Sequence, residues 1–209
     1  MPSPHSSHPE YPGQPASTAG VSVMKRLTWS LASFGRPRLR RQALELLIAV
    51  TDLPGTGWRE LHTGSWRIGV GAGQSGPVAK RARKTGAFTA IRRFRNDETS
   101  RGVMVQIIPL ADSEDARAQV RESRTSIVRW NGVTTLAERT IDDISVPMTD
   151  ALLAWERLNE REGYGQGYSR TIAANVGQRA FFVSCTSLGE GCQWSEVVEI
   201  AASQAKRLA

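Results

Sequence analysis

The sequence predicts an α+β fold, in which helices pack on an antiparallel β-sheet, preceded by a disordered N-terminal tail. Residues 1–23 consist mainly of Pro, Ser, Gly, Thr and Ala, and such a segment buries too little apolar surface to offset the entropy lost on ordering. Residues 87–127 combine strand, turn and helix patterns, and the chain ends in an amphipathic helix pattern. We therefore assign residues 1–35 to the tail and residues 36–209 to a single α+β domain.

The domain begins with a basic amphipathic helix pattern over residues 36–50, in which apolar residues keep helical spacing and arginines fill the first turns. A surface helix that binds an anionic membrane or nucleic acid has this pattern. A helix that packs on the core with a solvated basic start has it too, and the sequence leaves both interpretations open. The apolar positions are Leu39, Ala43, Leu46, Leu47 and Val50, and the arginines are Arg38, Arg40 and Arg41.

A strand pattern at residues 58–70 is followed by a glycine-rich segment with the spacing G-x-G-x-x-G, from Gly71 to Gly76. In dinucleotide-binding proteins this spacing lets the backbone approach a pyrophosphate at the start of a helix. Here Pro77 follows at once, and strand-like sequence resumes too soon to leave room for a full crossover helix. We therefore interpret the segment as a glycine turn and expect no nucleotide cofactor.

A hairpin and a helix are predicted next. Residues 88–94 alternate between apolar and more polar side chains, and residues 103–108 are almost continuously apolar, as expected for a more central strand. Asp112 or Ser113 is then placed to cap a helix.

Arg92 interrupts the apolar side of the first of these strands, which also carries Phe88, Ala90 and Phe94. Long basic side chains reach solvent readily from a partly apolar face. We therefore expect this strand at an edge of the sheet with Arg92 reaching outward. The alternative is an arginine that lines a pocket.

Further strands and a helix complete the predicted domain. Residues 133–146 fit one bent strand or two short ones, and residues 151–158 fit either a strand or a helix. Residues 168–174 and 179–186 predict two strands joined by a turn. The last element is a helix capped at Ser195. Its buried stripe consists of Val197, Ala201, Ala205 and Leu208.

Positive charge gathers in the first half of the chain. Residues 1–101 contain 16 Lys and Arg against 6 Asp and Glu, whereas the remainder contains 11 against 14. Such asymmetry suits a nucleic-acid, anionic-membrane or acidic-protein partner, and it also occurs on ordinary solvated surfaces. No helix-turn-helix, zinc-finger or aromatic RNA-binding pattern supports base-specific recognition. The candidate anion-binding residues are Arg38, Arg40, Arg41, Lys80, Arg81, Arg83, Lys84, Arg92, Arg93 and Arg95.

Cys185 and Cys192 are the only two cysteines. A disulfide between them requires an oxidising compartment, and two reduced thiols are the alternative. His62 is the sole histidine outside the tail, so a metal site lacks ligands and we expect none. Neither His62 nor Cys185 lies in a known nucleophile motif. We therefore expect no catalytic residue and no cofactor, and we favour a non-enzymatic role.

No segment approaches the roughly 18 consecutive apolar residues of a membrane-spanning helix. Residues 24–34 have a basic start and a weakly apolar middle, as a secretory signal does, but Arg36 ends the stretch too early. We therefore expect a cytoplasmic location. The alternative is a secreted or cell-surface protein with an atypical signal or a different start site.

Two stretches form a recognisable order of elements. The first is a helix followed by residues 53–58 (Leu-Pro-Gly-Thr-Gly-Trp), and the second is residues 181–185 (Phe-Phe-Val-Ser-Cys) followed by a helix over residues 201–208. Over residues 38–208 this order resembles the sensor-type domains found outside the membrane in actinobacterial serine/threonine kinases and related lipoproteins. The resemblance implies an antiparallel sheet with packing helices and a non-enzymatic, ligand-binding role. It implies no particular functional residue.

We therefore predict a sensor-like module that binds a ligand or a protein on the concave face of its sheet or in its loops. The alternative is a basic accessory protein that binds nucleic acid or an anionic membrane through the clusters at residues 36–41 and 80–95. No motif in the sequence specifies the ligand.

Overall fold

The computed structural model describes residues 37–67, 77–124, 133–161, 163–188 and 191–209. The tail at residues 1–35 and the Gly71–Gly76 motif lie outside these described residues. The predictions of a disordered tail and of a glycine turn therefore remain predictions.

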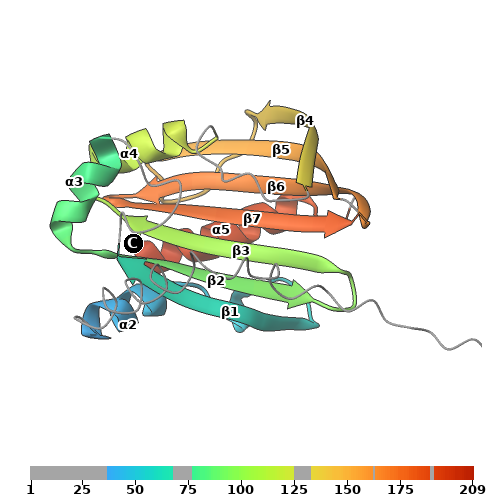
Figure 1. Cartoon of the computed structure of the whole chain (residues 1–209), viewed down its shortest axis with the longest axis horizontal. Helices are drawn as coiled ribbons and strands as arrows, with labels where there is room; N and C mark the ends of the chain where they lie inside the picture. The colour runs from blue at the N-terminus through green and yellow to red at the C-terminus, as the bar shows by residue number, and fades with distance from the viewer. Residues whose placement is uncertain (1–36, 68–76, 125–132, 162, 189–190) are drawn as a thin grey trace, which may run out of the picture. The chain divides into compact units, whose positions relative to one another are not determined.

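Seven antiparallel strands form one sheet in the order β1-β2-β3-β7-β6-β5-β4 (Figure 1). The pairing of β3 with β7 joins the first three strands to the last four, so residues about eighty positions apart lie side by side, as Val103 and Cys185 do. This arrangement confirms the predicted α+β fold with an antiparallel sheet. The strands are β1 (Trp58–Arg67), β2 (Phe88–Asn96), β3 (Arg101–Pro109), β4 (Val133–Ile141), β5 (Ala151–Arg161), β6 (Gly165–Val176) and β7 (Arg179–Leu188).

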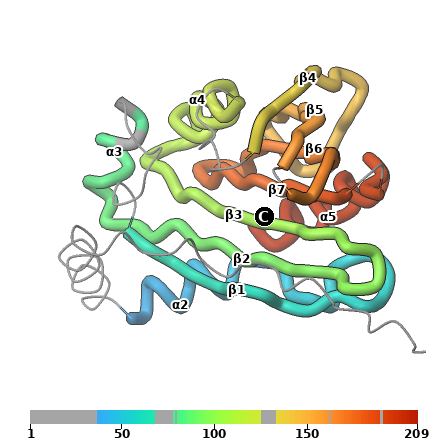
Figure 2. The backbone as a smooth tube through the Cα atoms, turned by 45° about the vertical axis from the view of Figure 1, so that its right-hand side comes forward, coloured from blue at the N-terminus to red at the C-terminus, as the bar shows by residue number. Residues whose placement is uncertain are grey.

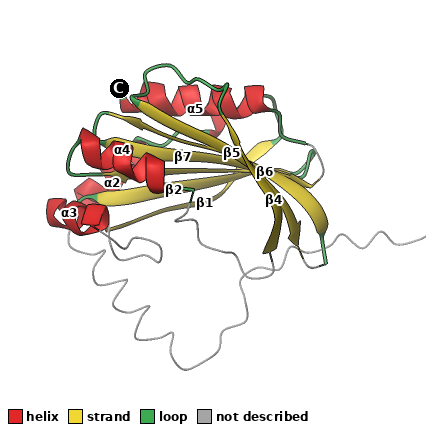
Figure 3. Ribbon diagram, turned by 90° about the horizontal axis from the view of Figure 1, so that it is seen from above, coloured by secondary structure: helices red, strands yellow, loops and turns green. Residues whose placement is uncertain are grey.

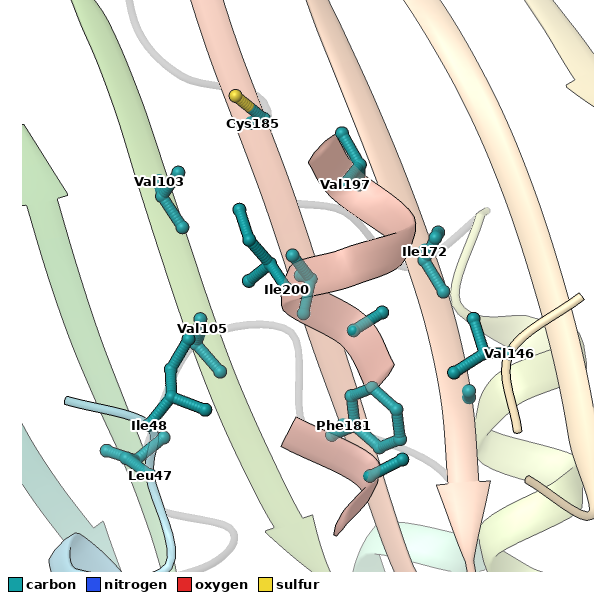
Figure 4. Close-up of a cluster of buried hydrophobic side chains, with 14 of the residues drawn as sticks. Leu47, Ile48, Val103, Val105, Val146, Ile172, Phe181, Cys185, Val197 and Ile200 are labelled. Atoms are coloured by element: carbon teal, nitrogen blue, oxygen red, sulfur yellow. The ribbon is translucent and has the colours of Figure 1, made fainter. Parts of the chain in front are cut away.

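One side of the sheet, here called the covered face, packs against α5 (Trp194–Leu208) and the segment that follows α2 (Pro37–Glu45). Alternate residues of the central strands point to this side and are buried, because strand side chains alternate between faces. Figure 4 shows Val103, Val105 and Phe181 of the sheet beside Val197 and Ile200 of α5. The covered face is marked by Phe94, Val103, Val105, Phe181 and Val183.

The opposite side, here called the open face, carries the residues that alternate with these. Two helices, α3 (Pro77–Thr85) and α4 (Ser113–Glu122), pack on one end of it, near Ile108 and Ala180. Figure 2 shows α3 and α4 beside each other at that end of the sheet. Figure 3 shows α5 on the other side of the sheet, with the strands around β4 bending away from α5. The open face is marked by Arg93, Met104, Gln106, Phe182 and Ser184.

Three local predictions are corrected or resolved by the structure. The basic segment before β2, to which the sequence analysis assigned no helix, forms α3, whose Val78 and Ala82 are buried against the sheet and α4. Residues 151–158, which fitted a strand or a helix, belong to β5 because they pair with both β4 and β6. The last helix begins at Trp194 with Gln193 as its cap, two residues before the predicted cap Ser195.

The expectation that β2 lies at an edge is wrong, because β2 pairs with β1 on one side and with β3 on the other. Arg92 does not reach solvent freely, since its side chain is only 17% exposed. Its Nη1 donates to the carbonyl oxygen of Ile48 at 2.7 Å, and its Nε lies 3.2 Å from a carboxylate oxygen of Glu60. Arg92 therefore anchors the segment after α2 to the covered face.

In the part of the chain that the structure describes, every helix is too short or too polar to cross a bilayer.

Candidate functional site

The open face is the candidate site, because the central strands of the sheet leave it partly exposed. Along β3 and β7, the residues on the covered face are buried, whereas Met104, Gln106, Phe182 and Ser184 on the open face are half-buried. Met104 pairs with Ser184, and Gln106 pairs with Phe182, so the four form one contiguous patch. Central strands of a large sheet are normally covered on both faces or polar on the exposed one. Here apolar and polar side chains are mixed, as in ligand and protein interfaces.

Arg93 lies beside this patch, since it pairs with Met104 across β2 and β3 and with His62 across β1 and β2. The Arg93 side chain is half-buried, and burial lowers the pKa of its guanidinium below the ordinary value. The guanidinium of Arg93 therefore lies in a partly desolvated setting in the middle of the open face.

Two arginines share one carboxylate at the β1–β2 side of the open face. Nε of Arg95 lies 2.7 Å from Asp97, and Nε of Arg59 donates to the same carboxylate at 2.5 Å. The hydrogen bond from Arg59 holds the pKa of Asp97 below its usual range. The carboxylate therefore stays ionised between the two guanidinium groups.

A second carboxylate shared by two arginines lies at the β4–β5 edge of the open face. Arg124, which follows α4, and Arg157 of β5 both donate to the carboxylate of Glu138 on β4. Burial acts to raise the pKa of Glu138, but the hydrogen bonds from the two arginines outweigh it and hold the pKa below the ordinary value. Arg157 also lies over the ring of Trp155, with Cζ 5.9 Å from the ring centre.

The ten candidate anion-binding residues do not share one surface. Arg92 points to the covered face, where α2, which carries Arg38, Arg40 and Arg41, packs at the β1–β2 side. Arg93 and Arg95 point to the open face, on which α3 packs. Lys80, Arg81, Arg83 and Lys84 lie on α3. The two basic clusters that the sequence places on α2 and at residues 80–95 therefore belong mainly to different sides of the sheet.

Several of these basic side chains make contacts within the domain. Nε of Arg81 donates to both carboxylate oxygens of Asp115 on α4, each at 2.9 Å. This hydrogen bonding lowers the pKa of Asp115, whose side chain is buried. Nε of Arg40 donates to Oγ of Ser65, and Arg41 pairs with Glu45. The Arg81–Asp115 contact fastens α3 to α4 and the Arg40–Ser65 contact fastens α2 to β1, whereas the Arg41–Glu45 pair lies within α2. Arg81 and Arg40 therefore have a structural role, although the sequence presents them as candidate ligands.

Cys185 and Cys192 are joined by a disulfide in the structure, with their Cα atoms 6.4 Å apart. Cys185 lies on the covered face of β7, and Cys192 lies two residues before α5. The bond therefore ties the start of α5 to the centre of the sheet. His62 lies on the open face, so the structure does not bring it together with Cys185.

We propose that this disulfide is present in the native protein. Thiol titration of the native protein is expected to find free thiols only after reduction. Replacing both cysteines by alanine is expected to lower the free energy of unfolding by about 2.5 kcal/mol, the chain-entropy value for so short a loop. Urea unfolding of the parent protein and of the double variant measures this loss. Reductant should destabilise the parent protein but not the double variant, which cannot form the bond. Two free thiols in unreduced protein would contradict the proposal.

No group of three or more His, Cys, Asp and Glu among the described residues is arranged to hold a metal ion. Sequence reasoning missed the two shared carboxylates, Asp97 and Glu138. The pairing of Glu138 with Arg157 follows from the β4–β5 register, and a correct hairpin alignment would have revealed it. The pairing of Arg124 with Glu138 depends on where α4 ends above the sheet, which no local pattern encodes.

No protein-family model and no curated protein matches the sequence. Among solved structures, the chain is similar to the extracellular domain of PknH from Mycobacterium tuberculosis. The TM-score is 0.52 and the identity 12%, and the match covers 81% of this chain and 95% of that one. An uncharacterised protein from Mycobacterium smegmatis matches with a TM-score of 0.42 and 8% identity, over 74% of this chain and 90% of that one.

The resemblance to extracellular sensor domains of actinobacterial kinases is confirmed at the level of the fold. The expectation of a cytoplasmic location is corrected by the same comparison, because the solved domain that shares this fold is extracellular. That expectation depended on the lack of a clear leader segment, which is a weak indicator of location.

Proposed function

We propose that this protein is a non-enzymatic, sensor-like binding module that acts outside the cell or at its surface and binds its ligand on the open face. The observation that carries the proposal is the alternation along β3 and β7, the two strands at the centre of the sheet. Their covered-face residues are buried under α5, whereas Met104, Gln106, Phe182 and Ser184 are half-buried.

The chemistry of the open face supports binding. Half-buried apolar side chains such as Met104 and Phe182 contribute favourably to the free energy of binding when a ligand removes their remaining surface from water. Gln106 and Ser184 offer donors and acceptors that orient a ligand. The shared fold with an extracellular kinase domain and the disulfide at the start of α5 both support a location outside the cytoplasm.

The test is a screen of small neutral and charged fragments against the full-length, isotope-labelled protein. Binding is detected through changes in the chemical shifts of the backbone amides. The fragments that bind are expected to shift amides clustered at Met104, Gln106, Phe182 and Ser184. Replacing Ser184 by tryptophan should block the patch and abolish these shifts.

Ser195→Trp is the matched control, since Ser195 is exposed on α5 and lies outside the open face. This variant is expected to keep the fragment-induced shifts. Shifts that cluster away from the patch would contradict the proposed site. Chemical turnover of any bound compound would contradict the non-enzymatic role.

A further inference from the structure

We propose that the end of the sheet at which α2 and α3 pack binds the surface of an anionic lipid bilayer. This inference rests on the location outside the cytoplasm proposed above, but it concerns a surface separate from the open-face patch. Three observations support it. Exposed cations without partners gather at this end, the chain around them lacks carboxylates, and α2 exposes a leucine beside its arginines.

The two basic helices pack on different sides of the sheet but at the same end of it. Figure 1 and Figure 2 both show α2 and α3 at this end. Nε of Arg40 on α2 donates to Oγ of Ser65, two residues before β1 ends at Arg67. Arg67 pairs with Phe88, the first residue of β2, and α3 ends three residues earlier at Thr85. The end of β1 therefore lies near both helices.

Exposed cations without partners are concentrated at this end. Most described Lys and Arg side chains make an ion pair, a hydrogen bond or another electrostatic contact within the domain, as Arg81 does with Asp115 of α4. Apart from Lys206 on α5, the described cations without an ion pair or hydrogen bond to another described residue lie on α2, on α3 or at the end of β1, and they are exposed. These side chains, here called the basic end, are Arg38, Arg67, Lys80 and Lys84.

The chain around the basic end lacks carboxylates that could neutralise it. Residues 61–96, which include the end of β1, α3 and β2, contain no Asp or Glu. On α2 the only acidic residue is Glu45, and it pairs with Arg41. The adjoining sequence, at residues 24–36 and 68–76, contains no acidic residue either. The charges of the basic end are therefore available to an anionic surface, which they attract at distances of about one Debye length, roughly 8 Å in physiological salt.

α2 lacks the burial that normally stabilises a short helix. None of its nine residues is buried, and residues 37–42 are all exposed. A helix shorter than about 12 residues is marginal in water without packing, and arginines in its first turns oppose the helix dipole. Leu39 is 37% exposed between Arg38 and Arg40. A bilayer surface removes such a leucine from water and places lipid phosphates beside the arginines, so it stabilises α2.

A lipid bilayer matches these features better than a nucleic acid does. The surface of a bilayer offers hydrocarbon to Leu39 as well as phosphate to the basic end, whereas the backbone of a nucleic acid offers mainly phosphate. The chain also contains no motif that reads bases. The proposed location at the cell surface places the domain beside lipid.

The experiment is co-sedimentation of the full-length protein with two kinds of vesicle, one of mixed phosphatidylglycerol and phosphatidylcholine and one of phosphatidylcholine alone. The protein is expected to bind the anionic vesicles more tightly, and this binding should weaken as salt is raised. Arg67→Gln should weaken it about fivefold, the usual contribution of one cation near an anionic bilayer. Lys80→Gln combined with Lys84→Gln should weaken it about twentyfold.

Arg59→Gln is the matched control for Arg67→Gln, because Arg59 is an exposed arginine at the other end of the same strand. This variant should bind vesicles like the parent protein. Leu39→Gln should weaken binding to the anionic vesicles at least about threefold, since the apolar contact is lost. Leu188→Gln is its control, because Leu188 is also exposed but lies at the end of β7, away from α2. Circular dichroism checks that each variant is folded.

Equal binding to the two kinds of vesicle, or equal effects of Arg67→Gln and Arg59→Gln, would overturn the proposal. So would tighter binding of duplex DNA than of the anionic vesicles at the same salt concentration. If fragments still shift the amides of the open-face patch while the vesicles fail to bind, the lipid surface is excluded and the proposed binding function remains.

Discussion

Replacing Trp155 by alanine is expected to lower the free energy of unfolding by about 3–5 kcal/mol, the usual cost of removing a large aromatic side chain from a core. Trp155 of β5 is fully buried on the open-face side of the sheet, in a cluster that includes Ala116 and Val120 of α4. Its removal leaves a cavity beneath α4 that the rigid sheet cannot close. Typical domains are stable by about 5–15 kcal/mol, so this is a large fraction of the total.

The measurement is urea unfolding followed by circular dichroism. Trp155→Phe is the informative control, because Nε1 of Trp155 has no hydrogen-bond partner among the described residues. Phenylalanine therefore sacrifices some packing and no hydrogen bond, and it should cost about 1–2 kcal/mol. A loss below about 1 kcal/mol for the alanine variant would show that α4 does not depend on Trp155 for its packing on the sheet.

Replacing Glu156, the next residue, by glutamine is expected to cost about 3 kcal/mol for a different reason. The Glu156 side chain is only 7% exposed on the covered-face side of the sheet, where Arg139 and Arg170 both pair with its carboxylate. Nε of Arg170 donates to it at 2.5 Å, and the Arg170 side chain is itself 13% exposed. Glutamine fills the same volume but leaves the buried Arg170 charge without its counter-charge, which is costly in a low-dielectric site.

Glu114→Gln is the matched control, since Glu114 on α4 also pairs with two arginines, Arg117 and Arg121, but is 68% exposed. Exposed ion pairs contribute little, so this variant should change the stability by less than about 1 kcal/mol. The double variant Glu156→Leu with Arg170→Leu removes both buried charges and should recover much of the loss. Equal losses for Glu156→Gln and Glu114→Gln would contradict the assigned burial.

Trp155 and Glu156 are neighbours in the sequence but point to opposite sides of β5, and no local pattern shows which side each one faces. Residues 151–158 fitted both a strand and a helix, because a short apolar run satisfies both periodicities. Only the pairing of β5 with β4 and β6 sends Trp155 beneath α4 and Glu156 toward the covered face.

The sequence by itself determined the elements whose signal is local. The alternation of β2, the apolar run of β3 and the stripe of Val197, Ala201 and Ala205 in α5 depend on residues a few positions apart, and a strand or helix forms at each of these places. The order of elements also carried the resemblance to extracellular kinase domains, which the shared fold confirms.

The tertiary structure alone decided which face of the sheet stays open, that β2 is interior, and how the arginines divide between the two sides. The two-residue period of a strand shows that successive side chains point to opposite faces, but it does not show which face a distant helix will cover. The β3–β7 pairing and the packing of α5 join residues about eighty or more positions apart, as with Arg101 and Glu196. Which carboxylate an arginine meets also depends on such packing, as with Arg59 and Asp97 or Arg124 and Glu138, because the final arrangement of the elements brings the partners together.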